Sequence, residues 1–138
     1  MIHTPDDPSD HERIGGQSAV VRLVDRFYHY MDTLPEAAAI RALHDDDLTA
    51  DKHKLAAFLS GWLGGPPLYW QEYGHPRLRM RHGHLPIDTA AAAAWLTCMM
   101  AALEDVVEDA SLRASLTDRF AHTAAHLRNT PDAEPPER

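Results

Sequence analysis

The sequence predicts an all-α protein, and three observations lead to that prediction. Apolar residues recur at steps of three and four in four long segments, which is the spacing of one face of a helix. No stretch alternates apolar and polar residues for long enough to give a lone strand a partner. Residues suited to begin or end helices flank these segments. We therefore expect four sizeable helices in two antiparallel pairs, with a long connection between the second and the third.

The first two expected helices are bounded by glycine. Gly15 and Gly16 precede the first and permit a sharp entry. Its apolar face consists of Val20, Leu23, Val24, Phe27, Tyr28 and Met31. The second opens at Leu48 and Thr49, with Thr49 as the expected cap, and residues 64–67 (GGPP) end it. Its stripe is Leu55, Phe58, Leu59 and Trp62.

The third and fourth expected helices each follow a residue able to cap them. Asp88 is placed to cap the third helix, and Ser111 to start the fourth. The apolar stripe of the third is Trp95, Leu96, Met99, Met100, Leu103 and Val107. That of the fourth is Leu112, Leu116, Phe120, Ala124 and Leu127.

The connection over residues 66–86 has no sustained periodicity. Residues 78–82 (LRMRH) fit either a strand or a short helix after Pro76, and we favour the helix because a lone strand would lack a partner. Loops this long in a compact domain tend to be functional. This one is rich in side chains with chemistry: Tyr69, Tyr73, His75, Arg77, Arg79, Arg81, His82 and His84.

Length and charge limit the partners. A chain of 138 residues suits one domain, which we place at residues 14–129 between flexible extensions at 1–13 and 130–138. The net charge of -8 gives the chain no general electrostatic attraction to nucleic acid or to anionic membranes. The acidic start lacks the pattern of a signal peptide, and the longest nearly apolar stretch, 90–103, is too short to span a membrane. With Cys98 as the single cysteine, these features favour a cytoplasmic protein.

Three motifs resemble the truncated globins, and specifically their second group. They are GGPPLY at 64–69, GHPRLRMRH at 74–82 and WLTCM at 95–99, and the likeness extends over about residues 14–129. The resemblance implies a short globin fold, a two-on-two helical sandwich with a short proximal helix in the long loop. It also implies a haem b cofactor, with His82 as the proximal ligand to iron.

The residues themselves support His82 only weakly. Globin-type iron takes one neutral imidazole from a helix, and Leu78 would share the helical face of His82. His75 precedes Pro76, which disfavours helical geometry, and His84 would point elsewhere. By spacing alone, an ordinary solvated histidine remains the simpler interpretation of each.

The resemblance also implies a distal pocket. Tyr28, His44 and Trp95 are the candidate hydrogen-bond donors to a bound gas. The resemblance places Tyr28 and Trp95 in this pocket, and it aligns His44 with a corner position whose residue varies among relatives. From the residues alone, Tyr28 and Trp95 could equally be core and His44 a surface residue. The alignment also places Asp51 where many globins carry a polar residue at the entrance of the distal pocket. A charge in the first turn of its helix is an equally natural interpretation of Asp51.

The remaining pocket residues are apolar side chains that line the pocket and cations at its edge. Leu55 and Phe58 are expected to form an apolar wall, with Met99 bordering it, although packing alone would explain all three. The family pattern places Lys54 and Arg81 near the two haem propionates. Solvent-facing charges are the alternative for both.

These features predict a haem protein that binds dioxygen and other small diatomic ligands, as a monomer or a homodimer. Redox chemistry on nitric oxide or peroxide is a possible extension, and whether the protein is an enzyme stays open. No flavin or nicotinamide fingerprint is present, so repeated redox turnover would need a separate reductase. The alternative is a haem-free, all-helical interaction domain whose histidines are surface residues.

Overall fold

The computed structural model describes residues 8–75 and 87–128, and all the regular structure in these ranges is helical. The elements in chain order are α1 (Asp10–Ile14), α2 (Gln17–Thr33), the 3-10 turn η1 (Pro35–Ala37), α3 (Ala38–Arg41), α4 (Thr49–Trp62), α5 (Leu68–Tyr73), α7 (Thr89–Val106) and α8 (Ala110–Leu127). The all-α prediction is confirmed.

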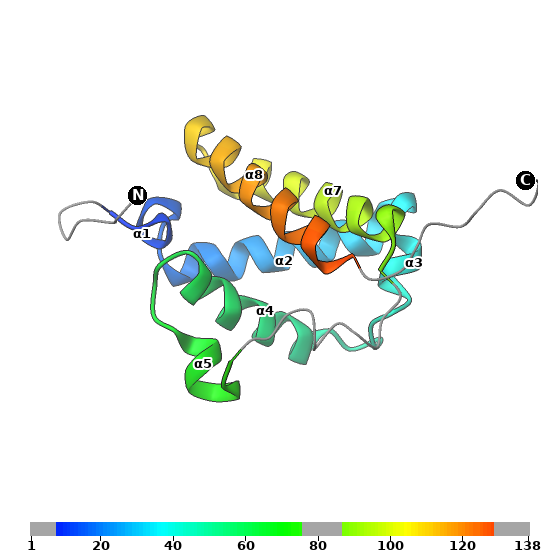
Figure 1. Ribbon diagram of the computed structural model, residues 1–138, viewed down its shortest axis with the longest axis horizontal. Coiled ribbons are helices and arrows are strands. Elements are labelled where there is room, and N and C mark those ends of the chain that lie inside the picture. Colours follow the sequence, from blue (N-terminus) through cyan, green and yellow to red (C-terminus); the bar gives the residue numbers. More distant parts are fainter. Residues whose placement is uncertain (1–7, 76–86, 129–138) are drawn as a thin grey trace, which may run out of the picture.

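The four long helices form two antiparallel pairs. Helix α4 runs back beside α2, and α8 runs back beside α7 after a short turn (Figure 1). The pairs meet mainly where α2 packs on α7. This is the arrangement that the four periodic segments predict.

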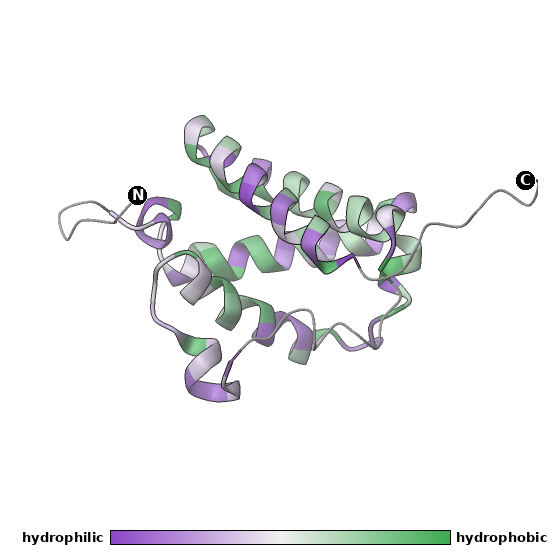
Figure 2. Ribbon diagram, viewed as in Figure 1, coloured by the Kyte–Doolittle hydropathy of each residue, from purple (hydrophilic) through white to green (hydrophobic). Residues whose placement is uncertain are grey.

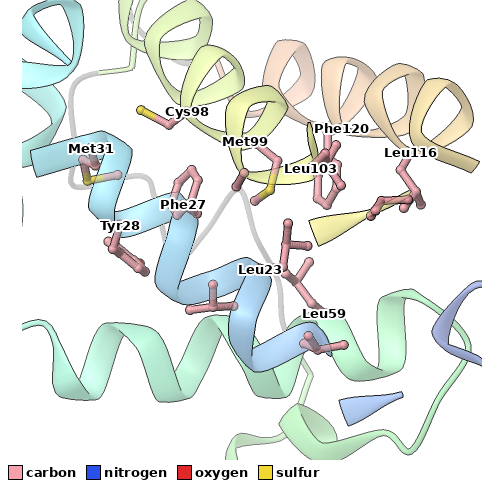
Figure 3. Close-up of a cluster of buried hydrophobic side chains, with 14 of the residues drawn as sticks. Leu23, Phe27, Tyr28, Met31, Leu59, Cys98, Met99, Leu103, Leu116 and Phe120 are labelled. Carbon is pink, nitrogen blue, oxygen red and sulfur yellow. The ribbon is translucent and has the colours of Figure 1, made fainter. Parts of the chain in front are cut away.

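Helix α2 lies at the centre because its apolar stripe is almost wholly buried. Green hydrophobic and purple hydrophilic residues alternate along it (Figure 2), as expected of a helix with one buried face. Its buried residues are Ala19, Val20, Leu23, Val24, Phe27, Tyr28 and Met31. The core continues into α7 and α8, where Met99, Leu103, Leu116 and Phe120 are each no more than 2% exposed (Figure 3).

One residue of the expected stripe on α7 faces outward. Met100 is 44% exposed, whereas Met99 and Leu103 are fully buried. Trp95 and Leu96 are half-buried. The expected face was therefore too wide, because adjacent residues on a helix lie about 100° apart and only one of Met99 and Met100 can point at α2.

The helix caps confirm one expectation and correct two. The carboxylate of Asp88 accepts a hydrogen bond from the backbone N–H of Ala91, as predicted. At α8, the cap is Asp109 rather than Ser111, whose own N–H donates to that carboxylate. At α4, Thr49 is the first helical residue, and its N–H donates to the Asp47 carboxylate. In both corrections an aspartate two residues earlier satisfies the free N–H groups.

The N-terminal boundary also differs from the prediction. Residues 10–13, expected to belong to a flexible extension, form α1, which the side chain of Ser9 caps. The backbone N–H of His11 donates to the carbonyl of Leu63 at 2.8 Å, and the His11 side chain is buried. The five-residue helix is thus held by contacts with the end of α4 and with α2 and α8, and not by its own periodicity.

The long connection contains a helix that periodicity did not predict. Helix α5 packs on α4, and the bonded pair of His53 and Glu72 joins the two helices. The expected short helix at 78–82 lies outside the described residues. No helix in the described part is long and apolar enough to cross a membrane.

Candidate distal site

Tyr28 projects from the middle of α2 as a buried phenol. Its side chain is 5% exposed, and it points to the α4 side of the helix while its neighbour Phe27 points toward α7 (Figure 3). Burial, reinforced by the negative charge of Asp51, raises the pKa of the Tyr28 hydroxyl far above its ordinary value, while Arg41 lowers it slightly. The hydroxyl therefore stays protonated and able to donate at any physiological pH.

His44 faces Tyr28 from the corner between α3 and α4. The two ring centroids are 5.8 Å apart with an interplanar angle of 79°. The Nδ1 of His44 lies 2.9 Å from the carbonyl oxygen of Ile40. Because a carbonyl can only accept, Nδ1 carries the proton, and the Nε2 of the neutral ring is an acceptor.

Arg41 braces this corner, and sequence reasoning missed it. Its guanidinium donates to the Asp32 carboxylate on α2 and to the backbone carbonyls of Asp45 and Asp46. Asp32 lies one turn beyond Tyr28, so Arg41 ties the His44 corner to the helix that carries Tyr28. The sequence signal was a run of three aspartates, 45–47, that begins four residues after Arg41.

Trp95 enters the same region from α7. Its indole lies between two buried rings, with centroids 5.4 Å from Phe27 and 5.8 Å from Phe120. Phe27 also contacts Tyr28 edge-to-face at 4.9 Å. Ring contacts therefore run from His44 through Tyr28 and Phe27 to Trp95, and they bring the three predicted distal residues into one cluster.

Two donors in this cluster are unused. Within the described part of the chain, no hydrogen bond engages the Tyr28 hydroxyl or the Trp95 indole N–H. In the described part of the chain, every fully buried side-chain N or O atom has a hydrogen-bond partner. Since these two donors have none, they are not fully buried, and both border accessible space. Two free donors beside aromatic and aliphatic side chains can hold a small, partly negative ligand.

The expected wall residues are divided between this region and the core. Leu55 and Phe58 of α4 are half-buried and pack against the core, and Phe58 meets the ring of Tyr69 at 6.3 Å. Met99 is fully buried, and Figure 3 places it among core side chains. Because Met99 has no exposed surface, its packed neighbours separate it from any pocket.

The expected cations and histidines are only partly described. Lys54 is exposed, and its Nζ lies 5.7 Å from the centroid of the Tyr73 ring. His75 is exposed, with its ring 4.8 Å from that of Trp70. Arg81, His82 and His84 lie outside the described residues.

The donor set fits a haem with a gaseous ligand. A porphyrin needs apolar side chains against its faces, and a bound gas needs donors on the side opposite the proximal histidine. Leu55 and Phe58 supply half-buried apolar surface, and Tyr28 and Trp95 supply free donors.

Comparisons with known proteins agree with this chemistry. A model of the family described as bacterial-like globin matches residues 9–129. A group 2 truncated haemoglobin of Bacillus subtilis is 40% identical over 119 residues, which cover 86% of this chain and 88% of the relative. Among solved structures, the group II 2-on-2 haemoglobin of the plant pathogen Agrobacterium tumefaciens superposes with a TM-score of 0.88 at 41% identity, covering 93% of this chain and 99% of the other. The truncated oxygen-avid haemoglobin of Bacillus subtilis gives a TM-score of 0.81 at 38% identity, covering 88% and 100%.

Proposed function

The chain belongs to the bacterial-like globins as a group 2 truncated haemoglobin, and from that premise we propose that it binds dioxygen and other small diatomic ligands at the iron of haem b. The two-on-two globin fold and haem-based ligand binding follow from the family. The identity of the gas, the haem type and the role of each residue are the proposal. Family membership favours it over a haem-free interaction domain.

The observation that carries the proposal is the pair of unused donors. Ferrous haem iron supplies reversible binding of dioxygen and leaves negative charge on the gas. The N–H of Trp95 and the O–H of Tyr28 border accessible space without a partner in the described part of the chain. Donors already oriented toward such charge slow the release of the ligand. One similar structure is described as oxygen-avid, which supports the same property here.

The other pocket residues take supporting roles in the proposal. His82 is the proximal ligand, Leu55 and Phe58 form the apolar wall, and Lys54 and Arg81 pair with the propionates. Within the described part of the chain the Lys54 ammonium makes only a ring contact with Tyr73, and a propionate would attract it more strongly. His44 is the third member of the distal set, and its ring is held against Tyr28 by the contact of its Nδ1 with the carbonyl of Ile40.

Redox detoxification of nitric oxide or peroxide is a secondary proposal. The accessible donors of Tyr28 and Trp95 would orient such ligands as they orient dioxygen. Repeated turnover requires electrons from a separate reductase. We propose a cytoplasmic protein that is a monomer or a homodimer.

The test is the absorption spectrum of the purified protein combined with two histidine variants. We expect a strong Soret band that His82→Ala abolishes and His75→Ala leaves in place. Stopped-flow mixing of the ferrous protein with oxygen, and separately with nitric oxide, then distinguishes stable binding from turnover by rate. A protein that gains no Soret band on haem addition, or that loses the band with His75→Ala instead, would overturn the proposal.

A further inference from the structure

An arginine–tryptophan pair joins three helices at the end of the molecule that carries α1. The guanidinium carbon of Arg119, on α8, lies 3.9 Å from the centroid of the Trp62 ring at the end of α4. One guanidinium nitrogen donates to the Trp62 carbonyl at 3.1 Å, and another to the Asp10 carboxylate of α1 at 2.8 Å. Arg119 therefore fixes both the backbone and the ring of Trp62.

The fixed ring of Trp62 continues inward to the distal cluster. Trp62 stacks on Phe120 with centroids 4.5 Å apart and an interplanar angle of 25°. Phe120 is 2% exposed, and its ring meets that of Trp95 at 5.8 Å. The series Arg119, Trp62, Phe120 and Trp95 thus runs by direct contact from a surface ion pair to the proposed donor.

Trp95 needs such support because burial alone does not lock it. Its side chain is only half-buried, and no hydrogen bond in the described part of the chain holds the indole N–H. Its orientation therefore depends on the two rings that flank it, Phe27 and Phe120. A hydrogen bond weakens steeply as its angle departs from linear, so a looser indole is a poorer donor.

We propose that Trp62 and Arg119 are positioning residues that set the orientation of the Trp95 indole through Phe120. They touch no ligand themselves. The inference rests on the proposed function, in which Trp95 donates to the bound gas. It adds that the strength of this donation is set at the α1 end of the molecule, by residues of α4 and α8 that clamp Phe120.

The experiment compares two pairs of variants in the haem-loaded protein. Trp62→Leu removes the ring that stacks on Phe120, while Trp62→Phe keeps an aromatic face there. Arg119→Met removes the clamp on Trp62. Arg13→Met is its matched control, because Arg13 also pairs with Asp10, at 3.6 Å, and with Asp109, at 3.3 Å, and no hydrogen bond or ring contact joins it to Trp62 in the described structure.

Two readouts separate positioning from general stability. One is the oxygen dissociation rate. The other is solvent exchange of the Trp95 indole N–H, measured by NMR in protein labelled with 15N-tryptophan and saturated with carbon monoxide, with Trp95→Phe used to assign the signal. A merely structural role for Trp62 would lower the melting temperature without moving either readout.

We expect Trp62→Leu to speed oxygen dissociation about three- to tenfold and to accelerate indole exchange, because an aromatic pair contributes roughly that factor. Arg119→Met should change both readouts in the same direction by a smaller factor. Trp62→Phe and Arg13→Met should stay within about twofold of the parent.

Two results would overturn the inference. One is unchanged indole exchange and an oxygen dissociation rate within twofold of the parent in Trp62→Leu. Another is an equal effect of Arg13→Met and Arg119→Met, which would assign the change to α1 docking.

Failure of the proposed function looks different, because it appears as a missing Soret band. If Trp95→Phe leaves oxygen dissociation unchanged, the donor role fails, whereas faster indole exchange in Trp62→Leu would still support the positioning of Trp95.

Discussion

The Nδ1 of His44 is fixed at 2.9 Å from the carbonyl oxygen of Ile40, one helical turn earlier in the chain. This contact assigns the proton of the neutral ring to Nδ1 and leaves Nε2 as an acceptor. The same ring faces Tyr28, whose hydroxyl stays protonated. In this tautomer a hydrogen bond from Tyr28 to Nε2 would compete with donation to a bound gas.

Replacing His44 with phenylalanine should slow oxygen dissociation or leave it unchanged. The variant keeps an aromatic ring against Tyr28 and removes the competing acceptor, so the phenol becomes freer to donate to the ligand. A net hydrogen bond of about 0.5–1.5 kcal/mol corresponds to slowing of up to about tenfold. Stopped-flow displacement of oxygen measures it. Dissociation that becomes several times faster would mean that Nε2 carries a proton and donates to the ligand.

Trp95→Phe should speed oxygen dissociation by roughly ten- to a hundredfold while haem stays bound. Phenylalanine preserves ring packing between Phe27 and Phe120 but removes the N–H. A hydrogen bond to a charged partner contributes about 1.5–3 kcal/mol, which gives that range. An unchanged Soret band serves as the control for haem retention. An off-rate within about twofold of the parent would show that the indole is only packing and would transfer the donor role to Tyr28 and His44.

Asp105→Asn should destabilise the contact between α2 and α7 in a pH-dependent way. The Tyr30 hydroxyl donates to Asp105 at 2.6 Å and Arg26 donates at 2.8 Å, and these hydrogen bonds lower the pKa of that carboxyl below its ordinary value. A lowered pKa in the folded state contributes stability above the pKa of the unfolded chain, and this is lost as pH falls through the folded value.

The decrease in melting temperature should be small at pH 7, about 2–4 °C, because the group is near the surface. It should shrink as pH falls below about 4. Thermal melts across pH measure it, with Asp118→Asn as the control, since Asp118 is exposed and makes no ion pair in the described structure. A difference that stays constant from pH 7 to pH 3 would contradict the assignment.

Periodicity predicted the long helices because each has an apolar face that the others bury. Leu23 of α2 and Leu116 of α8 are fully buried on such faces. It did not predict α5, whose six residues are too few for a pattern and are held by contacts with α4. Caps were misplaced by one or two residues because threonine, serine and aspartate all suit the position, and only the fold decides which one bonds.

The distal cluster was predicted by resemblance more than by spacing. Tyr28 and Trp95 sit on helical stripes, and nothing in a stripe separates a donor from a core residue. Arg41 and Arg119 were missed because their partners are distant in the chain or are backbone carbonyls, such as that of Trp62, 57 residues away. Such contacts leave no periodic signal.

The docking of α1 left the least signal in the sequence, and it gives the last prediction. A methyl group on Gly65 would lie 2.5 Å from the Cγ and Cδ2 atoms of His11, closer than any stable contact. The His11 ring cannot easily move, because it is buried and its Nε2 bonds Gln17 at 3.1 Å. Gly65→Ala should therefore destabilise the protein by about 1–3 kcal/mol, as overpacking does.

A double-mutant cycle with His11→Ala tests the cause of that destabilisation. If the clash is responsible, Gly65→Ala should cost much less free energy of unfolding in the His11→Ala background, because the ring is gone. Gly61→Ala is the matched control: it lies within α4, its added methyl meets Pro67 at an ordinary 3.4 Å, and alanine is the better helix former. Chemical denaturation of the four variants and the parent supplies the free energies. Equal effects of Gly65→Ala with and without the His11 ring would show that α1 does not pack on this turn.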